Sequence, residues 1–286
     1  MKFVIIGAGI VGLSIAETLI NKKIVSPDNL IILDKYSVPS EGTSTHNSGV
    51  LHAGLYYKPG SLKAKLSIEG GHKLKNWCFE NDLPILKCGK LLVPFNQKDL
   101  VRLDEIFDNA TENGCEVKII NYSDAVKLQP GLIKQEKYLW SPKTAVFSPQ
   151  LIMKRLFELL KEKGVQFFKK GVILDDESKR RFLLEDKTYL HYSNYINCAG
   201  PGSLEITKSI SNKFDNLCIL PFLGEYGVQK SGLKIKTNLY PVPDPELPFL
   251  GIHLTPRINN STLIGPNAIP VFRKDIQGFA YEELKN

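Results

Sequence analysis

The glycine pattern at the start of the chain constrains its fold more than any other feature. The segment "FVIIGAGIVGLSIAETLIN" opens with an apolar run at residues 3–6, followed by Gly7, Gly9 and Gly12 and an apolar-periodic stretch at residues 10–21. This order predicts a buried strand, a tight turn and a helix. The first glycine permits the turn, the second lets backbone approach a pyrophosphate, and the third lets the helix pack closely on the strand. The helix N-terminus then offers free N–H groups to an anion.

An acidic residue follows at the expected distance. A second buried strand is predicted at residues 30–33, and Asp34 comes directly after it, 22 residues beyond Gly12. A carboxylate in this position can accept hydrogen bonds from ribose hydroxyls. The combination favours a dinucleotide-binding α/β domain over a glycine turn without a ligand. It does not distinguish NAD from FAD.

Composition narrows the class of protein. With 286 residues and 43% hydrophobic residues, the chain can form one large domain or two modest ones. The net charge of +7 comes from lysines spread along the chain, so no nucleic-acid partner is expected. Five cysteines without a CxxC pair predict reduced thiols and no metal site. No apolar run reaches membrane-spanning length. We therefore expect a cytoplasmic protein, or a peripheral one on the inner face of the membrane.

The rest of the chain predicts two domains. Helices are expected at residues 61–80 (interrupted at Gly70–Gly71), 99–113 and 149–163, and strands at residues 90–95, 165–168, 171–174 and 181–184. Residues 195–200 predict a further strand that runs into a glycine turn. The Gly-, Ser- and Pro-rich segment 35–60 predicts a long functional loop. The last nine residues, "GFAYEELKN", are typical of a polar helical tail.

This order of elements predicts an α/β fold. We expect a Rossmann-type FAD-binding domain at residues 1–84 and 141–215, and a second, mainly antiparallel β (α+β) substrate domain at residues 85–140 and 216–286. FAD is favoured by "YINCAG", since many FAD proteins return to the cofactor with a late strand that ends in a small-residue turn. The cofactor-binding candidates there are Cys198, Ala199 and Gly200. Cys198 is most simply a small buried hydrophobe, with a covalent flavin link as the alternative.

Eight blocks, in order from residue 3 to residue 272, carry a resemblance to a known family: "FVIIGAGIVGLSIA", "HNSGVLHAGLYYKPGSLKA", "CGKLLV", "FSPQLIMKRL", "NCAG", "PFLGEY", "YPVPDPELPFLGIHLT" and "LIGPNAIPVF". The chain resembles the L-2-hydroxyglutarate dehydrogenase/oxidase family of the D-amino-acid-oxidase-like FAD-dependent oxidoreductases. The resemblance implies an enzyme that oxidises L-2-hydroxyglutarate, or a similar 2-hydroxy acid, to the 2-oxo acid. Hydride would pass from C2 to flavin N5, and the electrons onward to oxygen or a quinone-linked chain.

The resemblance also assigns the segment after the second strand, which would run under the flavin ring. Cofactor contacts are expected from Asn47, Ser48, Gly49 and Ala53. His52 is the first catalytic candidate, because oxidation of a secondary alcohol needs a base for the hydroxyl proton. The alternative is that His52 only hydrogen-bonds the flavin or the backbone.

Two substrate carboxylates require cations, with tyrosines for orientation. The candidates are Tyr57, Lys63, Tyr226, Tyr240 and Arg257, with His253 as a second catalytic candidate. His253 lies in the alternating run "FLGIHLT", which places it opposite Ile252 and Leu254. A core histidine is the rival interpretation, and Lys63 and Tyr240 could equally serve the surface or packing.

The chain also departs from the family. Position 223 is leucine where the family has a basic residue, Pro256 replaces a common arginine, and family members continue further at the C-terminus. The alternatives are a non-catalytic or partner-dependent remnant, an amine oxidase of the glycine or sarcosine type, and a glycerol-3-phosphate dehydrogenase. A phosphate substrate would need an arginine cluster, which is lacking near the candidate residues.

Overall fold

The computed structural model describes residues 2–36, 39, 42–229, 232, 234–246, 251–271 and 281–283. The chain divides into two compact units. Unit 1 comprises Met1–Asn47, Pro149–Pro221 and Val271–Gly278, and unit 2 comprises Ser48–Ser148, Phe222–Pro270 and Phe279–Asn286. These boundaries differ from the expected domain boundaries. Residues 48–84 belong to unit 2, because Val50 and Leu51 pair with a strand of that unit and Leu55 is buried in its core.

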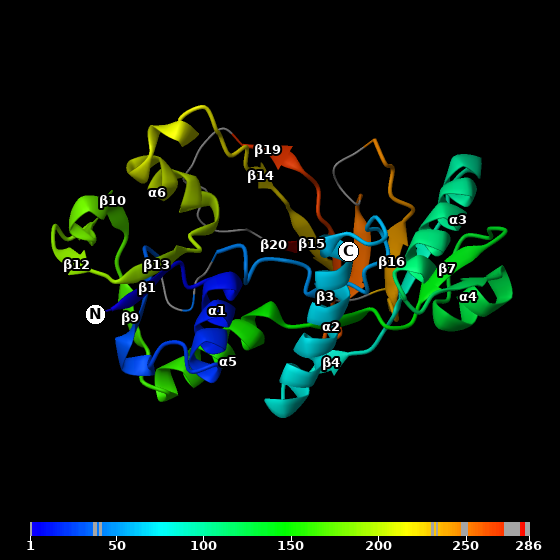
Figure 1. Cartoon of the computed structure of the whole chain (residues 1–286). Helices are drawn as coiled ribbons and strands as arrows, with labels where there is room; N and C mark the ends of the chain where they lie inside the picture. Colours follow the sequence, from blue (N-terminus) through cyan, green and yellow to red (C-terminus); the bar gives the residue numbers. More distant parts are fainter. Residues whose placement is uncertain are drawn as a thin grey trace. The chain divides into compact units, whose positions relative to one another are not determined.

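Unit 1 is built on a four-stranded parallel sheet in the order β13–β1–β2–β9 (Figure 1). Its strands are β1 (Phe3–Ile6), β2 (Leu30–Asp34), β9 (Gln166–Lys169) and β13 (Asn194–Asn197). Every residue of β2 is buried, as expected for the centre of a parallel sheet that is covered on both faces. The predicted strands at residues 3–6 and 30–33 and the helix at residues 10–21 are confirmed.

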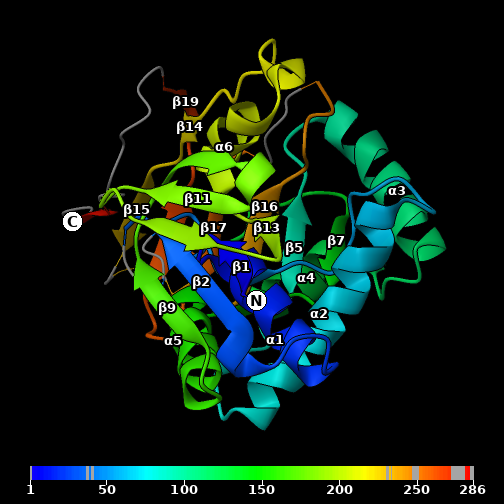
Figure 2. The same ribbon diagram turned by 60° about the vertical axis from the view of Figure 1, so that its left-hand side comes forward.

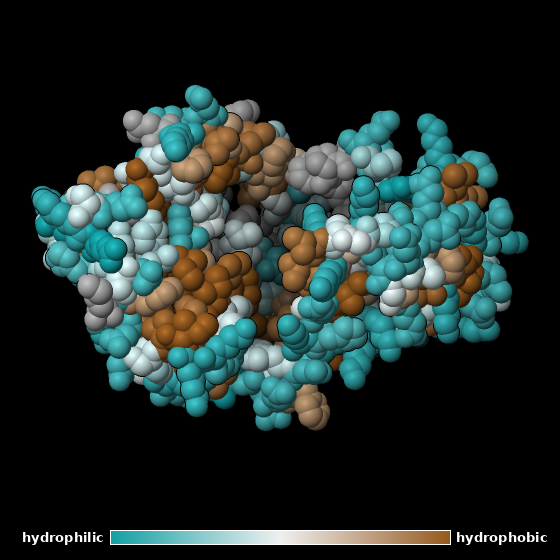
Figure 3. Space-filling view, viewed as in Figure 1, coloured by the Kyte–Doolittle hydropathy of each residue, from teal (hydrophilic) through white to brown (hydrophobic). Residues whose placement is uncertain are grey.

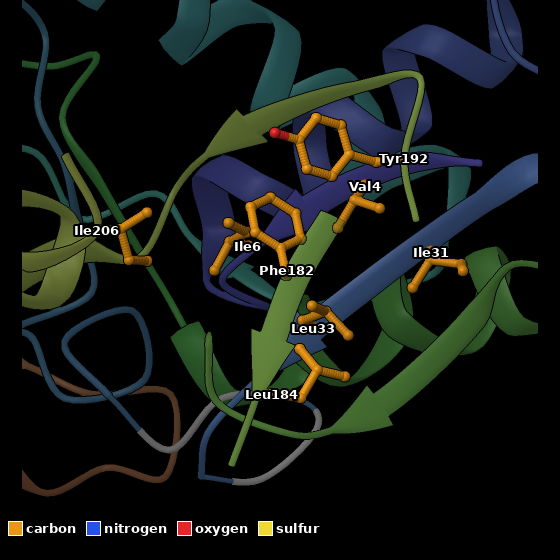
Figure 4. Packing of buried hydrophobic residues seen from close by; sticks show 8 residues of the cluster. All are labelled: Val4, Ile6, Ile31, Leu33, Phe182, Leu184, Tyr192 and Ile206. Atoms are coloured by element: carbon orange, nitrogen blue, oxygen red, sulfur yellow. The ribbon is translucent and has the colours of Figure 1, made fainter. Parts of the chain in front are cut away.

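Different elements cover the two faces of this sheet (Figure 2). The helices α1 (Ile10–Asn21) and α5 (Pro149–Glu162) pack together, and α1 lies against Ile5 of β1. The opposite face is covered by the antiparallel strands β10 (Val172–Asp176), β11 (Arg181–Leu184) and β12 (Tyr189–His191), with α6 (Ser203–Ile210) beside them. The core on that face contains Val4, Ile6, Ile31, Leu33, Phe182, Leu184, Tyr192 and Ile206 (Figure 4). Successive side chains of β1 and β2 point to opposite faces of the sheet, so the same two strands contribute to the hydrophobic core on each face.

Two of the patterned glycines are required by the packing of the backbone itself. Gly7 has a φ of +107°, and a Cβ added to it would lie 2.2 Å from the carbonyl oxygen of Cys198. A Cβ on Gly12 would lie 2.0 Å from the carbonyl oxygen of Gly7. Backbone atoms cannot give way as a side chain can. Residues 7 and 12 must therefore be glycine for the strand, the turn and the helix to meet.

Unit 2 contains an eight-stranded mixed sheet in the order β20–β15–β18–β17–β16–β5–β7–β6. Its strands are β5 (Lys90–Val93), β6 (Lys118–Ile120), β7 (Tyr138–Ser141), β15 (Tyr226–Gln229), β16 (Asn238–Pro241), β17 (His253–Pro256), β18 (Thr262–Gly265) and β20 (Tyr281–Glu283). Unit 2 also contains two smaller sheets. One has three strands in the order β3 (Val50–Leu51), β8 (Ala145–Phe147) and β4 (Ile85–Leu86). The other pairs β14 (Phe222–Leu223) with β19 (Ile269–Pro270). The predicted helical tail is wrong at residues 281–283, which pair with β15.

Helices cover this sheet on both faces. One core contains Leu92, Leu139 and Tyr240 together with Leu103 and Ile106 of α3 (Gln97–Glu112). On the other face, Leu91 and Tyr138 pack with Ala125 of α4 (Tyr122–Leu128). Within the described ranges, no helix combines the length and the apolar character needed to cross a bilayer.

The helix α2 (Leu62–Glu80) is continuous, so the predicted interruption at Gly70–Gly71 is wrong. Ser61 caps its N-terminus by accepting a hydrogen bond from the Ala64 N–H at 3.2 Å. A glycine inside a helix costs about 1 kcal/mol relative to alanine, which a capped helix of 19 residues can tolerate. No atom lies within 4 Å of a Cβ added to Gly70, so this glycine has no packing role.

Two glycine-to-alanine substitutions should therefore have opposite effects. Gly12→Ala should destabilise the protein by about 2–4 kcal/mol, since its methyl group collides with backbone. Gly70→Ala should stabilise it by about 0.5–1 kcal/mol by restricting the unfolded chain. Urea unfolding followed by circular dichroism measures both. Equal effects of the two substitutions would contradict the packing that we assign to Gly12.

Candidate functional site

In unit 1, the candidate site is the N-terminal turn of α1. Gly9 is the N-cap residue and has no side chain with which to cap the helix. The Ile10 N–H donates to Ser44 Oγ at 2.9 Å, and the Ala8 N–H donates to Asp34 Oδ2 at 2.9 Å. The side chains of Ile10 and Val11 are 36% and 60% exposed, and Figure 3 shows apolar surface over α1. A helix N-terminus beside exposed apolar side chains can bind a ligand with both anionic and apolar parts.

Gly9 differs from the other two glycines of the motif. Its φ of −74° suits any residue, and an added Cβ would meet only Ser44 Oγ, at 3.1 Å. A hydroxyl can rotate away, so the fold alone does not require glycine here. A pyrophosphate that approaches the backbone closely would require it. The structure thus fits a dinucleotide at this turn.

Asp34 is 8% exposed and stabilises the turn through hydrogen bonds to backbone N–H groups. Its Oδ2 accepts from Ala8, and its Oδ1 accepts from the Tyr36 N–H at 2.9 Å. A carboxylate oxygen has two acceptor positions, so both oxygens retain one for a ligand. The ribose contact expected for Asp34 stays a prediction.

The late strand of the sheet ends against the same turn. The Cys198 N–H donates to the Ile6 carbonyl at 2.7 Å, and the Ala199 N–H donates to Asn197 Oδ1 at 3.2 Å. Gly200 has a φ of +55° and open space around it. Burial raises the pKa of the Cys198 thiol, which agrees with a small buried residue and disfavours a thiolate. The backbone of Cys198 and Ala199 therefore lies against the glycine turn at Gly7.

Asn47, the last residue of the first segment of unit 1, stabilises the loop that carries Ser44. Its side-chain amide donates to the Thr43 carbonyl at 3.3 Å and to the Ser44 carbonyl at 3.1 Å. The structure thus connects Asn47 to the helix turn through Ser44. A direct contact of Asn47 with a cofactor stays a prediction.

In unit 2, one face of the large sheet carries a set of buried polar side chains. β5 and β16 are parallel neighbours with Lys90 opposite Asn238, and β17 follows β16. Residues two apart on a strand share a face, so Lys90, Tyr240 and His253 belong to the same side as the core residue Leu92. The loop after β3 adds two side chains. We call the group His52, Tyr56, Lys90, Tyr240 and His253 the His–Lys cluster.

The contacts of the cluster centre on Lys90 and Tyr240. Lys90 Nζ lies 3.1 Å from His52 Nδ1 and 3.5 Å from the Tyr56 hydroxyl. It also lies 4.2 Å from the centroid of the Tyr240 ring, in a cation–π contact. On β17, the His253 ring stacks on Tyr240 with centroids 3.9 Å apart.

Lys90 is a buried cation without a carboxylate. Its side chain is 0% exposed, and none of the ion pairs within the described residues involves it. Burial lowers the pKa of Lys90 to about 7. Burial, and secondarily Lys90 and His253, hold the pKa of His52 well below its ordinary value. At neutral pH the His52 ring is therefore uncharged.

The second histidine has a defined tautomer. His253 Nδ1 lies 3.0 Å from the Gly251 carbonyl, which can only accept, so Nδ1 carries the proton and Nε2 is a bare acceptor. Burial lowers the pKa of His253 to about 4, which keeps this ring neutral as well. His253 Nε2 is buried without a hydrogen-bond partner.

Other buried polar atoms on β16, on β17 and directly before β16 are also unsatisfied. Among the described residues they are Thr237 Oγ1, Asn238 Oδ1, the Tyr240 hydroxyl and Thr255 Oγ1. Ser48 and Thr255 face the Tyr240 hydroxyl without making a well-formed hydrogen bond, while burial and Tyr226 raise the pKa of this phenol. An unpaired buried polar atom costs about 1–3 kcal/mol, so such a concentration indicates a place where a polar ligand or water binds. No group of metal-ligating side chains occurs in the described part of the chain.

The structure brings together only part of the predicted set. His52, Tyr226, Tyr240 and His253 meet on one face of the unit 2 sheet, with Ser48 near Tyr240. The remaining candidates have other surroundings. Lys63 is exposed above the Tyr57 ring, and Arg257 opens the turn between β17 and β18. The Gly49 carbonyl accepts from Phe147, and Ala53 packs in the core that contains α3.

Sequence reasoning missed Lys90 and Tyr56. In "CGKLLV" the local pattern predicts Lys90 only as the first residue of a strand. The available signal was the position of a lysine directly before a buried apolar run, since lysine is almost never fully buried without a function or a partner. Tyr56 was passed over in favour of its neighbour Tyr57.

Comparisons with known proteins extend over nearly the whole chain. The family described as "FAD dependent oxidoreductase" matches residues 2–285. The mitochondrial L-2-hydroxyglutarate dehydrogenase of Caenorhabditis briggsae is 35% identical over 290 residues, which cover 97% of this chain and 65% of the relative. The L-2-hydroxyglutarate dehydrogenase of Escherichia coli K12 is 31% identical over 279 residues, with 96% and 65% covered. The chain thus spans slightly less than two thirds of the length of these relatives.

Solved structures share the fold. The dithionite-reduced L-α-glycerophosphate oxidase of Mycoplasma pneumoniae with FAD bound has a TM-score of 0.77 at 21% identity, covering 96% of this chain and 72% of the oxidase. At this identity the similarity concerns the fold alone. Together with the parallel and antiparallel sheets described above, it confirms the predicted α/β fold class.

Lys90 should reduce stability in a pH-dependent way. In the unfolded chain its pKa is ordinary, near 10.5, whereas in the fold it is about 7. The unfolded chain therefore binds more protons between these values, and the cost of the buried ammonium is greatest below pH 7 and fades as the pH rises towards 10.5. Lys90→Met should stabilise the protein by about 1–3 kcal/mol near pH 6, with a smaller gain at high pH.

Urea unfolding at several pH values measures this effect. The exposed Lys73→Met serves as the matched control and should change the free energy of unfolding by less than about 0.5 kcal/mol. A destabilising Lys90→Met with no pH dependence would contradict the uncompensated charge.

Proposed function

The chain belongs to the FAD dependent oxidoreductase family, and from this premise we propose that it takes part in the FAD-dependent oxidation of L-2-hydroxyglutarate, or a similar 2-hydroxy acid, to the 2-oxo acid. The names of its relatives support this substrate class. The observation that carries the proposal is the contact between His52 and Lys90: a neutral imidazole beside a buried lysine, with no acidic side chain of the described residues paired to that lysine. Such a site suits an anionic alcohol.

Unit 1 supplies the cofactor-binding groups in this proposal. The turn at Gly7, Gly9 and Gly12 binds the pyrophosphate, Asp34 accepts from a ribose hydroxyl, and the backbone of Cys198 to Gly200 borders the nucleotide. FAD, when bound, supplies the acceptor for the two electrons that leave C2 of the substrate. The protein provides binding and proton transfer.

His52 takes the hydroxyl proton in this mechanism. Its Nδ1 faces Lys90, which leaves Nε2 for the substrate, and its lowered pKa keeps the ring uncharged at neutral pH. Tyr226 and Tyr240 orient the substrate through their hydroxyls, and Arg257 is the proposed cation for a second carboxylate. His253 Nε2 is a further acceptor for a substrate hydroxyl or a water molecule.

Cofactor retention tests the role of Gly9. Gly9→Leu should leave the fold intact, since its backbone φ is ordinary and only a hydroxyl lies close to the added Cβ. The branched side chain would occupy the space of the pyrophosphate, so the purified protein should lose its visible flavin absorption. Gly70→Ala is the control and should retain flavin. A folded Gly9→Leu protein with full flavin content would contradict the proposed binding mode.

Anaerobic bleaching of the flavin tests the reaction. L-2-Hydroxyglutarate should bleach the holoprotein, whereas glycerol 3-phosphate and sarcosine should not. His52→Ala should retain flavin but slow bleaching by about 10²-fold or more, as expected for loss of a general base. The exposed His72→Ala should behave like the unaltered protein.

The pattern of bleaching distinguishes the possible substrates. Bleaching by sarcosine or glycerol 3-phosphate alone would favour an amine or a phosphate substrate. A flavin-bearing protein that none of the three compounds bleaches would favour a non-catalytic role. Unchanged bleaching in His52→Ala would remove His52 from the mechanism.

A further inference from the structure

A lysine occupies the position next to His52 where an acceptor would be expected. When a histidine acts as a base through one ring nitrogen, the other nitrogen carries a proton and donates it to an acceptor, commonly a carboxylate or a carbonyl. Here Nδ1 of His52 lies 3.1 Å from Lys90 Nζ. An ammonium group can only donate, and it would force the ring proton onto Nε2. A neutral amine can accept from Nδ1–H and leaves Nε2 bare.

From this geometry we propose that Lys90 is a positioning residue that sets the tautomer of His52 and receives the proton that passes through its ring. The inference rests on the proposed oxidation. The substrate O–H bond breaks as Nε2–H forms, and the Nδ1–H bond breaks as Nζ–H forms. The C2=O double bond forms from the electron pair of the broken O–H bond as the C2–H bond breaks, and the C2–H electron pair would leave as hydride, for which FAD, when bound, would be the acceptor that the proposed function names. Lys90 ends as an ammonium and His52 as the neutral Nε2–H tautomer.

Accessibility distinguishes this role from that of a substrate anchor. Lys90 is 0% exposed, whereas His52 keeps some exposed surface. The buried amine is closed to a ligand, so proton transfer to it must pass through a neighbouring side chain such as His52. A direct ion pair between Lys90 and a substrate carboxylate would require the sheet face to open.

The surroundings allow Lys90 both protonation states. The groups that face it are His52 and Tyr56 from the loop after β3, Tyr240 from β16 and His253 from β17. Burial raises the pKa of Tyr56 and Tyr240, and both imidazoles have lowered pKa values, so none of the four is charged at neutral pH.

More distant groups do not alter this balance. Tyr57 faces Tyr56, and Tyr226 and Cys88 face Tyr240; each of these contacts raises the pKa of a tyrosine further. The pKa of Lys90, about 7, therefore reflects burial and not a neighbouring cation. After proton uptake, the rings of Tyr240 and Tyr56, whose centroids lie 4.2 and 5.0 Å from Nζ, stabilise the ammonium.

Two substitutions separate a proton acceptor from a fixed charge. Arginine stays protonated and can only donate, whereas the glutamine carbonyl can accept from Nδ1–H. Lys90→Arg should slow flavin bleaching by L-2-hydroxyglutarate by about 10²-fold or more across the pH range. Lys90→Gln should bleach faster than Lys90→Arg and should lose the decline in rate below about pH 7 that titration of Lys90 causes in the unaltered protein.

Other outcomes overturn the proposal. If Lys90→Arg retains activity and Lys90→Gln does not, Lys90 acts as a fixed charge. If both variants lose activity equally and retain the original pH profile, its role is structural. If either variant fails to fold, the decision passes to a measurement on the unaltered chain.

That measurement is nitrogen NMR of ¹⁵N-histidine-labelled protein, with His52 assigned by His52→Gln. Between about pH 6.5 and pH 9 the His52 ring should stay neutral and should change from Nε2–H to Nδ1–H as Lys90 loses its proton near pH 7. A single tautomer throughout, or an imidazolium that forms near pH 6.5, would overturn the inference. The result does not depend on turnover, so it separates failure of this inference from failure of the proposed oxidation.

Discussion

The close approach of backbone to backbone at Gly7 is the constraint on which unit 1 depends. The carbonyl of Cys198 lies where any side chain at residue 7 would begin, and the carbonyl of Gly7 lies where one at residue 12 would begin. These contacts hold the ends of β1 and β13 and the start of α1 within a few ångströms of each other. The N–H groups of the turn are thereby fixed before any ligand arrives. A turn that is fixed in this way would lose little entropy on binding the proposed pyrophosphate.

Unit 2 shows the opposite relation between stability and function. Its sheet face places an ammonium, two imidazoles and several hydroxyls in the core and leaves some of their polar atoms without partners. A core built for stability alone would contain apolar side chains at these positions. The strands β5 and β16 hold the cluster in place because their other residues, such as Leu92 and Leu239, pack in ordinary hydrophobic cores. Stability given up at the cluster is thus offset by packing around it.

Much of unit 1 could be predicted from the sequence, because its signals are local. The glycine spacing, the apolar run before it and the periodic stretch after it defined β1, the turn and α1. The cluster of unit 2 depends instead on a pairing between β5 and β16, strands about 150 residues apart, which no local pattern reveals. The apolar run after Lys90 indicates burial, but its contact with Tyr240 depends on this pairing. The continuity of α2 through Gly70–Gly71 was missed because capping and packing outweighed a local propensity.

The polar segment between residues 42 and 57 serves both units, which explains why it forms no long helix. Ser44 accepts from the first N–H of α1, and Asn47 supports Ser44, so this end of the segment belongs to the helix turn. Eight residues after Ser44, His52 contacts Lys90, and Tyr56 follows four residues later. A helix would satisfy its own backbone groups and direct side chains around its axis, and it could not supply these contacts in sequence. The glycine, serine and histidine residues look irregular as a pattern, yet several of them contact different neighbours: Ser44 contacts Ile10, His52 contacts Lys90, and Gly54 lies against Ile68. In this segment the composition reflects its contacts, and these contacts exclude a long helix.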